Sequence, residues 1–317
     1  MSRGEIDLVW HGGDVGYADD SFLHKDCVFA FCYESVYDEY MDAIQPWSSS
    51  VPYMVMPGNH EADCHDPACL ADPAKREKLS NFTTFNTRFH MPAEESLATS
   101  LNMHYSFNYK NVHFISMDSE TGYPGAGEET RYVLPCGGFT QNQLEWLEAD
   151  LIQANKDRAQ RPWIMAQAHR PIYQGESVNK DYQAAVEDLF LKYKVDVYFA
   201  GHVHWYERNF PVYDSVVPST DETTAYVNPE YTTYIMAGGA GNDEMRKTLA
   251  QSGVFRDPSP VLMKDSKNTG PWTAFQDQTH IGFGKVNIRD AETLTFEYVL
   301  AENGKVADSF TLTRSRA

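Results

Sequence analysis

Four short apolar runs, each followed at once by residues that can bind metal ions, constrain the fold of this chain more than any other feature. A continuous apolar run of about four to eight residues is typical of a strand buried on both faces, as in α/β sheets. Ligands of such sheets bind beyond the carboxyl ends of the strands. The four segments are IDLVWHGGDVGY (6–17), VPYMVMPGNHE (51–61), WIMAQAHRP (163–171) and VDVYFAGHVHWYER (195–208).

The residues just past these runs all carry a side-chain atom that can bind a metal. They are Asp14, Tyr17, Asn59, His60, His169, His202 and His204. Carboxylate, phenol and amide oxygens are hard donors, whereas imidazole nitrogens are borderline. One zinc ion would not use so many ligands, but two ions about 3.5–4 Å apart that share Asp14 as a bridge would use them. The sequence therefore predicts a dinuclear metal site.

Tyr17 narrows the choice of metal. A free phenol titrates near pH ~10, so it binds well only to a strongly Lewis-acidic ion such as Fe³⁺. We therefore expect Fe³⁺ together with one divalent ion, and Zn²⁺, Fe²⁺ and Mn²⁺ all remain open. We expect Glu61 to orient His60 or a loop amide rather than to bind metal. Tyr206, Glu207 and Arg208 are expected to support the GHVH loop through hydrogen bonds.

The four segments resemble the motifs of the purple acid phosphatases, within the calcineurin-like metallophosphoesterase superfamily. The sequences GDVGY (13–17), GNHE (58–61), AQAH (166–169) and GHVH (201–204) are similar to the family's GDxxY, GNHE, VxxH and GHxH, with Ala166 for valine. Four motifs in the right order make a chance match improbable. Residues 105–120 and 270–288 also look like fungal-type members, so the resemblance runs through nearly the whole chain.

The resemblance implies a role for each predicted site residue. Asp14 would bridge the two ions, and Tyr17 and His204 would bind the ferric ion. The divalent ion would be held by Asn59, His169 and His202. His60 would be catalytic, contacting the phosphate or protonating the leaving alcohol. The implied reaction is the hydrolysis of a phosphate monoester by an acid phosphatase.

One motif of the family is missing. The family has a DxG motif upstream of GDxxY, and its aspartate completes the ferric site. Only thirteen residues precede Asp14, and the carboxylates among them are Glu5 and Asp7. A strand rises about 3.3 Å per residue, so Asp7 lies too far along its own strand to reach the same ion. We therefore expect an α/β sandwich of the calcineurin-like type (αββα) that is truncated and lacks its first strand.

Two other functions remain open at this point. The missing aspartate favours a weakly active or inactive metal-binding remnant of such an enzyme. A related phosphodiesterase or nucleotidase is the second alternative, although those enzymes commonly have histidine where Tyr17 stands. The net charge of −19 disfavours nucleic acid and acidic membranes as partners. The sequence has no run of about eighteen apolar residues, so no membrane span is predicted.

Several residues also bear on the cellular compartment of the protein. Met1 leads into polar residues, so no signal peptide is predicted. Asn81 begins a glycosylation sequon, and Cys64 and Cys69 are close enough for a small disulfide, although buried thiols and a chance sequon would give the same pattern. Cys27 and Cys32 lie in an aromatic segment that is typical of a packed helix. The family resemblance implies a secreted or vacuolar (lysosomal) glycoprotein.

The order of elements predicts the domain organisation. Strands alternate with amphipathic helices, expected at 141–157 and 181–194, which is the α/β signature. After residue 212 the composition shifts toward Thr, Tyr, Val and Gly, which indicates strands and hairpins. We expect a metallophosphoesterase domain over 1–212 and a strand-rich C-terminal domain over 225–314, from which His280 could approach the site.

Overall fold

The computed structural model describes residues 6–23, 27, 31–64, 66–98, 101–121, 142–218, 222–241 and 268–315. Two compact units divide the chain. The first unit comprises Met1–Ser106 and Ser116–Trp146, and the second unit comprises Phe107–Ile115 and Leu147–Ala317.

The second unit is built on a seven-stranded sheet with the order β12-β9-β11-β8-β5-β4-β3. Its strands are β3 Tyr105–Tyr109, β4 Val112–Ser116, β5 Trp163–Gln167, β8 Val197–Ala200, β9 Tyr206–Pro211, β11 Thr233–Ala237 and β12 Thr273–Asp277. Strand β8 pairs in parallel with both β5 and β11, whereas β9 runs antiparallel to β11 and β12. Every residue of β5 is buried, as its continuous apolar run predicts.

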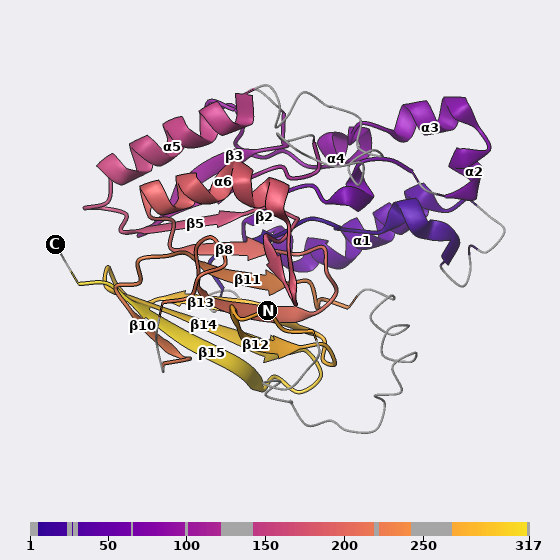
Figure 1. Ribbon diagram of the computed structural model, residues 1–317. Helices are drawn as coiled ribbons and strands as arrows, with labels where there is room; N and C mark the ends of the chain where they lie inside the picture. The colour runs from indigo at the N-terminus through magenta and orange to yellow at the C-terminus, as the bar shows by residue number, and fades with distance from the viewer. Residues whose placement is uncertain are drawn as a thin grey trace. The chain divides into compact units, whose positions relative to one another are not determined.

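Two predicted helices cover one face of this sheet. Helix α5 spans Leu144–Lys156 and α6 spans Lys180–Tyr193, and both lie over β5 and β8 (Figure 1). The ring of Tyr198 in β8 packs against Phe190 of α6, at 5.4 Å between centroids. The Asn179 side chain accepts from the backbone N–H of Tyr182 and so caps the start of α6. The small hairpin β6 Tyr173–Gln174 and β7 Ser177–Val178 precedes α6.

The other face is covered by a four-stranded sheet with the order β10-β15-β14-β13 (Figure 1). Its strands are β10 Ala225–Val227, β13 Gly282–Ile288, β14 Thr293–Leu300 and β15 Val306–Thr313. The rings of Tyr206 and Tyr298 stack at 3.9 Å between the two sheets. A buried ion pair joins Arg208 to Asp308. The predicted α/β fold with a strand-rich C-terminal module is confirmed.

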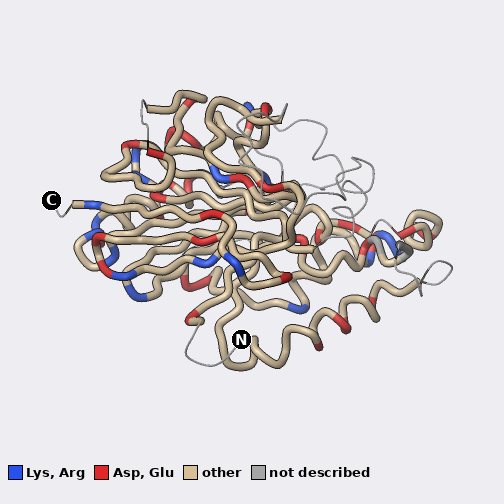
Figure 2. Tube along the Cα trace, turned by 90° about the horizontal axis from the view of Figure 1, so that it is seen from below, with Lys and Arg blue, Asp and Glu red and all other residues tan. Residues whose placement is uncertain are grey.

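The first unit contains a small parallel sheet and several short helices. Strand β1 Val9–His11 pairs in register with β2 Tyr53–Val55, and the two form a sheet of their own among the described residues. The helices are η1 Ala18–Leu23, α1 Tyr33–Ser48, η2 Asn59–Glu61, α2 Pro67–Leu70, α3 Pro73–Leu79 and α4 Thr83–Arg88. The trace of α1 carries acidic and no basic residues (Figure 2), and Arg88 of α4 bonds to two of its carboxylates.

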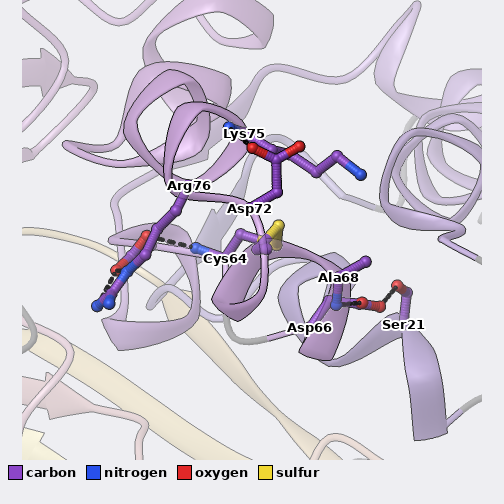
Figure 3. Close-up of a disulfide and its surroundings, with 9 residues drawn as sticks. Ser21, Cys64, Asp66, Ala68, Asp72, Lys75 and Arg76 are labelled. Atoms are coloured by element: carbon purple, nitrogen blue, oxygen red, sulfur yellow. Dashed lines mark hydrogen bonds and ion pairs between the residues drawn. A yellow bond between two sulfur atoms is a disulfide. The ribbon is translucent and has the colours of Figure 1, made fainter.

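Two disulfides close short loops in the first unit. The predicted Cys64–Cys69 bond is confirmed. Beside it, Asp66 accepts hydrogen bonds from Ser21 Oγ at 2.8 Å and from Ala68 N at 2.7 Å (Figure 3). Cys27 and Cys32 form a second disulfide and neither lies in a helix, whereas 28–30, on which the prediction of a packed helix also falls, lie outside the described residues. The second bond closes just before α1 begins.

Candidate metal centre

Asp14 and Tyr17 lie together in the loop that follows β1. The Tyr17 hydroxyl donates a hydrogen bond to Asp14 Oδ2, and the two oxygens are 3.2 Å apart. Oxygen ligands lie about 2.0–2.2 Å from a metal, so two of them on one ion at right angles are about 3 Å apart. The spacing of these two oxygens therefore fits a pair of ligands to a shared ion.

A glycine allows this loop to lie directly on the loop that follows β2. Gly13 has a φ of 87°, and a Cβ added there would be 2.6 Å from the backbone nitrogen of Gly58. No side chain fits between the two loops, so only glycine permits this close approach of the backbones. The geometry places the GDVGY and GNHE motifs side by side within the first unit.

Glu61 holds the same two loops together with its carboxylate. Its Oε2 accepts hydrogen bonds from the backbone N–H groups of Asp14 at 2.8 Å and Gly58 at 2.7 Å. Its Oε1 accepts from Val15 N at 2.9 Å. The expectation that Glu61 orients loop amides is confirmed. Burial raises the pKa of Glu61 to about 7, the Asp14 carboxylate adds to the rise, and the hydrogen bonds from Gly58 and Val15 oppose it.

His60 is held between Asp14 and Asp19. Its backbone N–H donates to Asp14 Oδ1 at 3.1 Å, and its ring atom Nδ1 lies 2.8 Å from Asp19 Oδ2. Its ring also packs on Tyr17, at 4.2 Å between centroids. With Nδ1 engaged by Asp19, Nε2 is the ring atom suited to contact a substrate.

Asp19 is a functional candidate that the sequence analysis did not single out. It lies in η1, two residues after Tyr17, and its side chain is fully buried. Buried carboxylates are rare unless they have a partner. A buried acidic residue so close to a predicted ligand therefore indicates a role at the site. In sequence, however, Asp19 and Asp20 look alike, and nothing there tells which carboxylate turns inward.

The histidines of the second unit lie beyond two neighbouring strands. His169 follows β5, and His202 and His204 follow β8, which runs parallel to β5. The rings of His169 and His202 are 5.1 Å apart between centroids and nearly perpendicular. The carbonyl of His169 also accepts a hydrogen bond from Gly201 N at 2.9 Å. The prediction that these strand ends bring their histidines together is confirmed for His169 and His202.

Three of the predicted ligands have a strained backbone. Asp14, Tyr17 and His202 have φ values of 55°, 50° and 63°, in the left-handed region. Such conformations cost on the order of 1 kcal/mol or more and concentrate at functional sites. A second close approach fixes the GHVH loop, because a Cβ on Gly238 would be 1.9 Å from the carbonyl oxygen of Val203.

The predicted ligands thus form two groups, one in each unit. The first unit holds Asp14, Tyr17 and Asn59, with Asn59 opening η2, and the second unit holds the three histidines. Hard oxygen donors and borderline imidazoles are both present, which suits a ferric and a divalent ion. His280 is bonded through Nδ1 to Asp277 Oδ2 at 2.9 Å, and its approach to the site stays a prediction.

Comparisons with known proteins agree with these motifs. The family model for calcineurin-like phosphoesterase matches residues 2–206, and that for iron/zinc purple acid phosphatase-like protein C matches residues 231–309. An acid phosphatase of Aspergillus ficuum is 29% identical over 407 residues, which cover 96% of this chain and 63% of the relative. A "probable inactive purple acid phosphatase 27" of Arabidopsis thaliana is 29% identical, over 98% of this chain and 44% of the relative.

A solved structure extends the likeness to the fold. A purple acid phosphatase isolated from yellow lupin seeds superimposes with a TM-score of 0.67 and 26% sequence identity, covering 98% of this chain and 47% of the lupin chain. The predicted resemblance to purple acid phosphatases is therefore confirmed. The chain spans 63% of the length of the Aspergillus enzyme and less of the two plant proteins.

Proposed function

The chain belongs to the calcineurin-like phosphoesterase family, and we propose that it is an acid phosphatase that hydrolyses phosphate monoesters at a centre of Fe³⁺ and one divalent ion. The observation that carries the proposal is the pair of oxygens on Asp14 and Tyr17, 3.2 Å apart. A phenol next to a carboxylate is the donor set expected for a ferric ion. The iron and zinc in the name of the C-terminal family model support the same choice.

In this proposal six ligands bind one pair of ions. Asp14 bridges the ions, Tyr17 and His204 bind Fe³⁺, and the divalent ion is bound by Asn59, His169 and His202. Each group of ligands lies beyond the carboxyl ends of paired parallel strands, where α/β sheets bind their ligands. The proposed domains are residues 1–212 and 225–314.

The chain's own residues then have distinct tasks in the reaction. When bound, such a pair of ions supplies an activated water molecule and balances charge on the phosphoryl oxygens. Asp19 accepts the Nδ1–H of His60 and stabilises the positively charged ring. His60 then donates the proton on Nε2 to the oxygen of the leaving alcohol. Glu61 keeps the Asp14 loop and the His60 loop at a fixed spacing.

The test is hydrolysis of p-nitrophenyl phosphate by the chain after loading with iron and zinc, with bound metal measured by elemental analysis. The proposal predicts two metals per chain and turnover in mildly acidic buffer. Two bound metals without turnover would instead support the metal-binding remnant, which the word "inactive" in the name of the Arabidopsis relative favours. Faster turnover of bis-p-nitrophenyl phosphate would support the phosphodiesterase.

The proposed compartment is secreted or vacuolar. Disulfides form and persist in oxidising compartments, and the first unit has two of them. Asn81 of the sequon is exposed, so it is a plausible glycan site in the folded chain. Expression in a secretory host followed by peptide mapping tests this, and an unmodified Asn81 would contradict the glycoprotein proposal. Among the described helices, none has the length and apolarity needed to cross a membrane.

A further inference from the structure

Glu207 is a fully buried carboxylate on β9, close in sequence to His204. Its Oε2 accepts hydrogen bonds from Gly175 N at 2.8 Å, Gln276 Nε2 at 2.9 Å and Trp205 Nε1 at 3.1 Å. Its Oε1 accepts from Thr273 Oγ1 at 3.0 Å. A carboxylate offers about four acceptor positions, and four donors bond to this one.

The donors come from three segments of the second unit, two of which carry predicted metal ligands. Trp205 directly follows His204 and ends the GHVH loop. Gly175 lies in the turn between β6 and β7, on the segment that begins at His169. Thr273 and Gln276 belong to β12, which pairs with β9 and gives the carboxylate a rigid base.

We propose that Glu207 is a positioning residue that fixes the His169 segment and the GHVH loop relative to each other. This inference rests on the proposed metal centre. The two segments leave the sheet at Gln167 and Ala200, and a backbone hydrogen bond, from Gly201 N to the His169 carbonyl, still joins them beside the ligands. Hydrogen bonds to a buried charged acceptor are short and strong. A metal site needs its ligands held within about 0.5 Å of the productive geometry.

The arrangement of donors predicts which substitutions are tolerated. In Glu207→Gln the amide oxygen can replace Oε2 and accept the same three N–H groups. The amide nitrogen then faces the Thr273 hydroxyl, which can accept as well as donate. Glu207→Ala leaves all four donors without their acceptor. Trp205→Phe removes a single donor, the one on the GHVH loop, and preserves an aromatic ring.

The test is calorimetric titration of the full chain with Zn²⁺, with circular dichroism to measure folding and melting temperature. We expect Glu207→Ala to weaken zinc binding by about 10–100-fold, as loss of an outer-shell partner does. Glu207→Gln should stay close to wild type, and Trp205→Phe should fall between them. The control is Asp196→Asn, because this buried carboxylate bonds to Arg158 and Ile164 N at the amino end of β8. It should lower the melting temperature and leave zinc affinity unchanged.

The outcomes separate this inference from the proposed function. A wild-type chain that binds no zinc overturns the metal centre and this inference with it. If Glu207→Ala folds and binds zinc as tightly as the wild-type chain, the inference is overturned and the metal centre is not. Equal losses of zinc affinity in Asp196→Asn and Glu207→Ala would also overturn the inference, because the effect would then be general destabilisation. Should Glu207→Ala not fold, Trp205→Phe decides, and wild-type affinity in that variant contradicts the proposal.

Discussion

His60 Nδ1 lies 2.8 Å from the Oδ2 of Asp19, a carboxylate with no exposed surface. Water screens a buried charge only weakly, so Asp19 acts on the ring more strongly than an exposed carboxylate would. The contact fixes the orientation of the ring, and in the proposed function Nε2 is the atom that transfers the proton.

The first prediction concerns this pair. His60→Ala should keep both metals and lower kcat by about 10²–10⁴-fold, the usual contribution of a general acid. Asp19→Asn should lower kcat less, because the amide oxygen can still accept a hydrogen bond from Nδ1. The double variant should lower kcat no more than His60→Ala alone. Steady-state kinetics with elemental analysis checks this. Loss of a metal in His60→Ala would make His60 a ligand and refute the assignment.

The second prediction concerns Glu61. Glu61→Gln places an NH₂ group where one oxygen accepted a backbone N–H, so at least one buried donor loses its partner. The free energy of unfolding should fall by about 1–3 kcal/mol. Metal affinity should also fall, because the Asp14 and His60 loops lose their fixed spacing. Urea denaturation and zinc titration measure the two effects.

The matched control for Glu61 is Glu187→Gln in the second unit. Glu187 is another buried carboxylate, and it accepts hydrogen bonds from Tyr234 and from the Gln183 amide. Its substitution should lower stability without changing metal affinity. If both variants bind zinc like wild type, Glu61 stabilises the fold and has no part in arranging the site.

The third prediction concerns acid stability. Burial raises the pKa of Asp118 to about 7, from an ordinary value of 3.8. Between these two pH values the folded chain keeps a proton that the unfolded chain releases, so stability falls as pH rises from about 4 to 7. Asp118→Asn removes the titrating group. The fall in melting temperature over that pH range should become shallower, and an unchanged slope would show that Asp118 is already ionised in the folded chain.

The parts of the fold that follow from local pattern were predictable from sequence. The buried runs at β5 and β8 and the amphipathic repeat of α6 each occupy one continuous segment. Because β5 and β8 are parallel neighbours, the meeting of His169 and His202 followed from the sheet rule alone. The donor types at Asp14 and Tyr17 likewise indicated a shared ion before any distance was known.

Features that depend on contacts between distant segments were not predictable. Asp19 and His60 are 41 residues apart, and no periodicity marks Asp19 as the carboxylate that turns inward. The Cys27–Cys32 disulfide was missed because aromatic neighbours suggested a helix. The four hydrogen bonds to Glu207 likewise come from segments that only the folded chain brings together.

The fourth prediction concerns colour. A phenolate bound to Fe³⁺ absorbs visible light by charge transfer from ligand to metal, so the iron-loaded chain should be pink or purple. Tyr17→Phe should abolish the band, because phenylalanine has no oxygen to bind the ion. An absorption spectrum checks this, and a band that survives unchanged in Tyr17→Phe would exclude Tyr17 as the ligand.

The central claim is that the six proposed ligands bind one pair of ions. Elemental analysis of the iron- and zinc-loaded chain, beside Asp14→Ala in the first unit and His202→Ala in the second, tests it most directly. The account predicts two metals per wild-type chain, loss of both in Asp14→Ala because that residue is the bridge, and loss of the divalent ion in His202→Ala. Two metals retained in Asp14→Ala would contradict it.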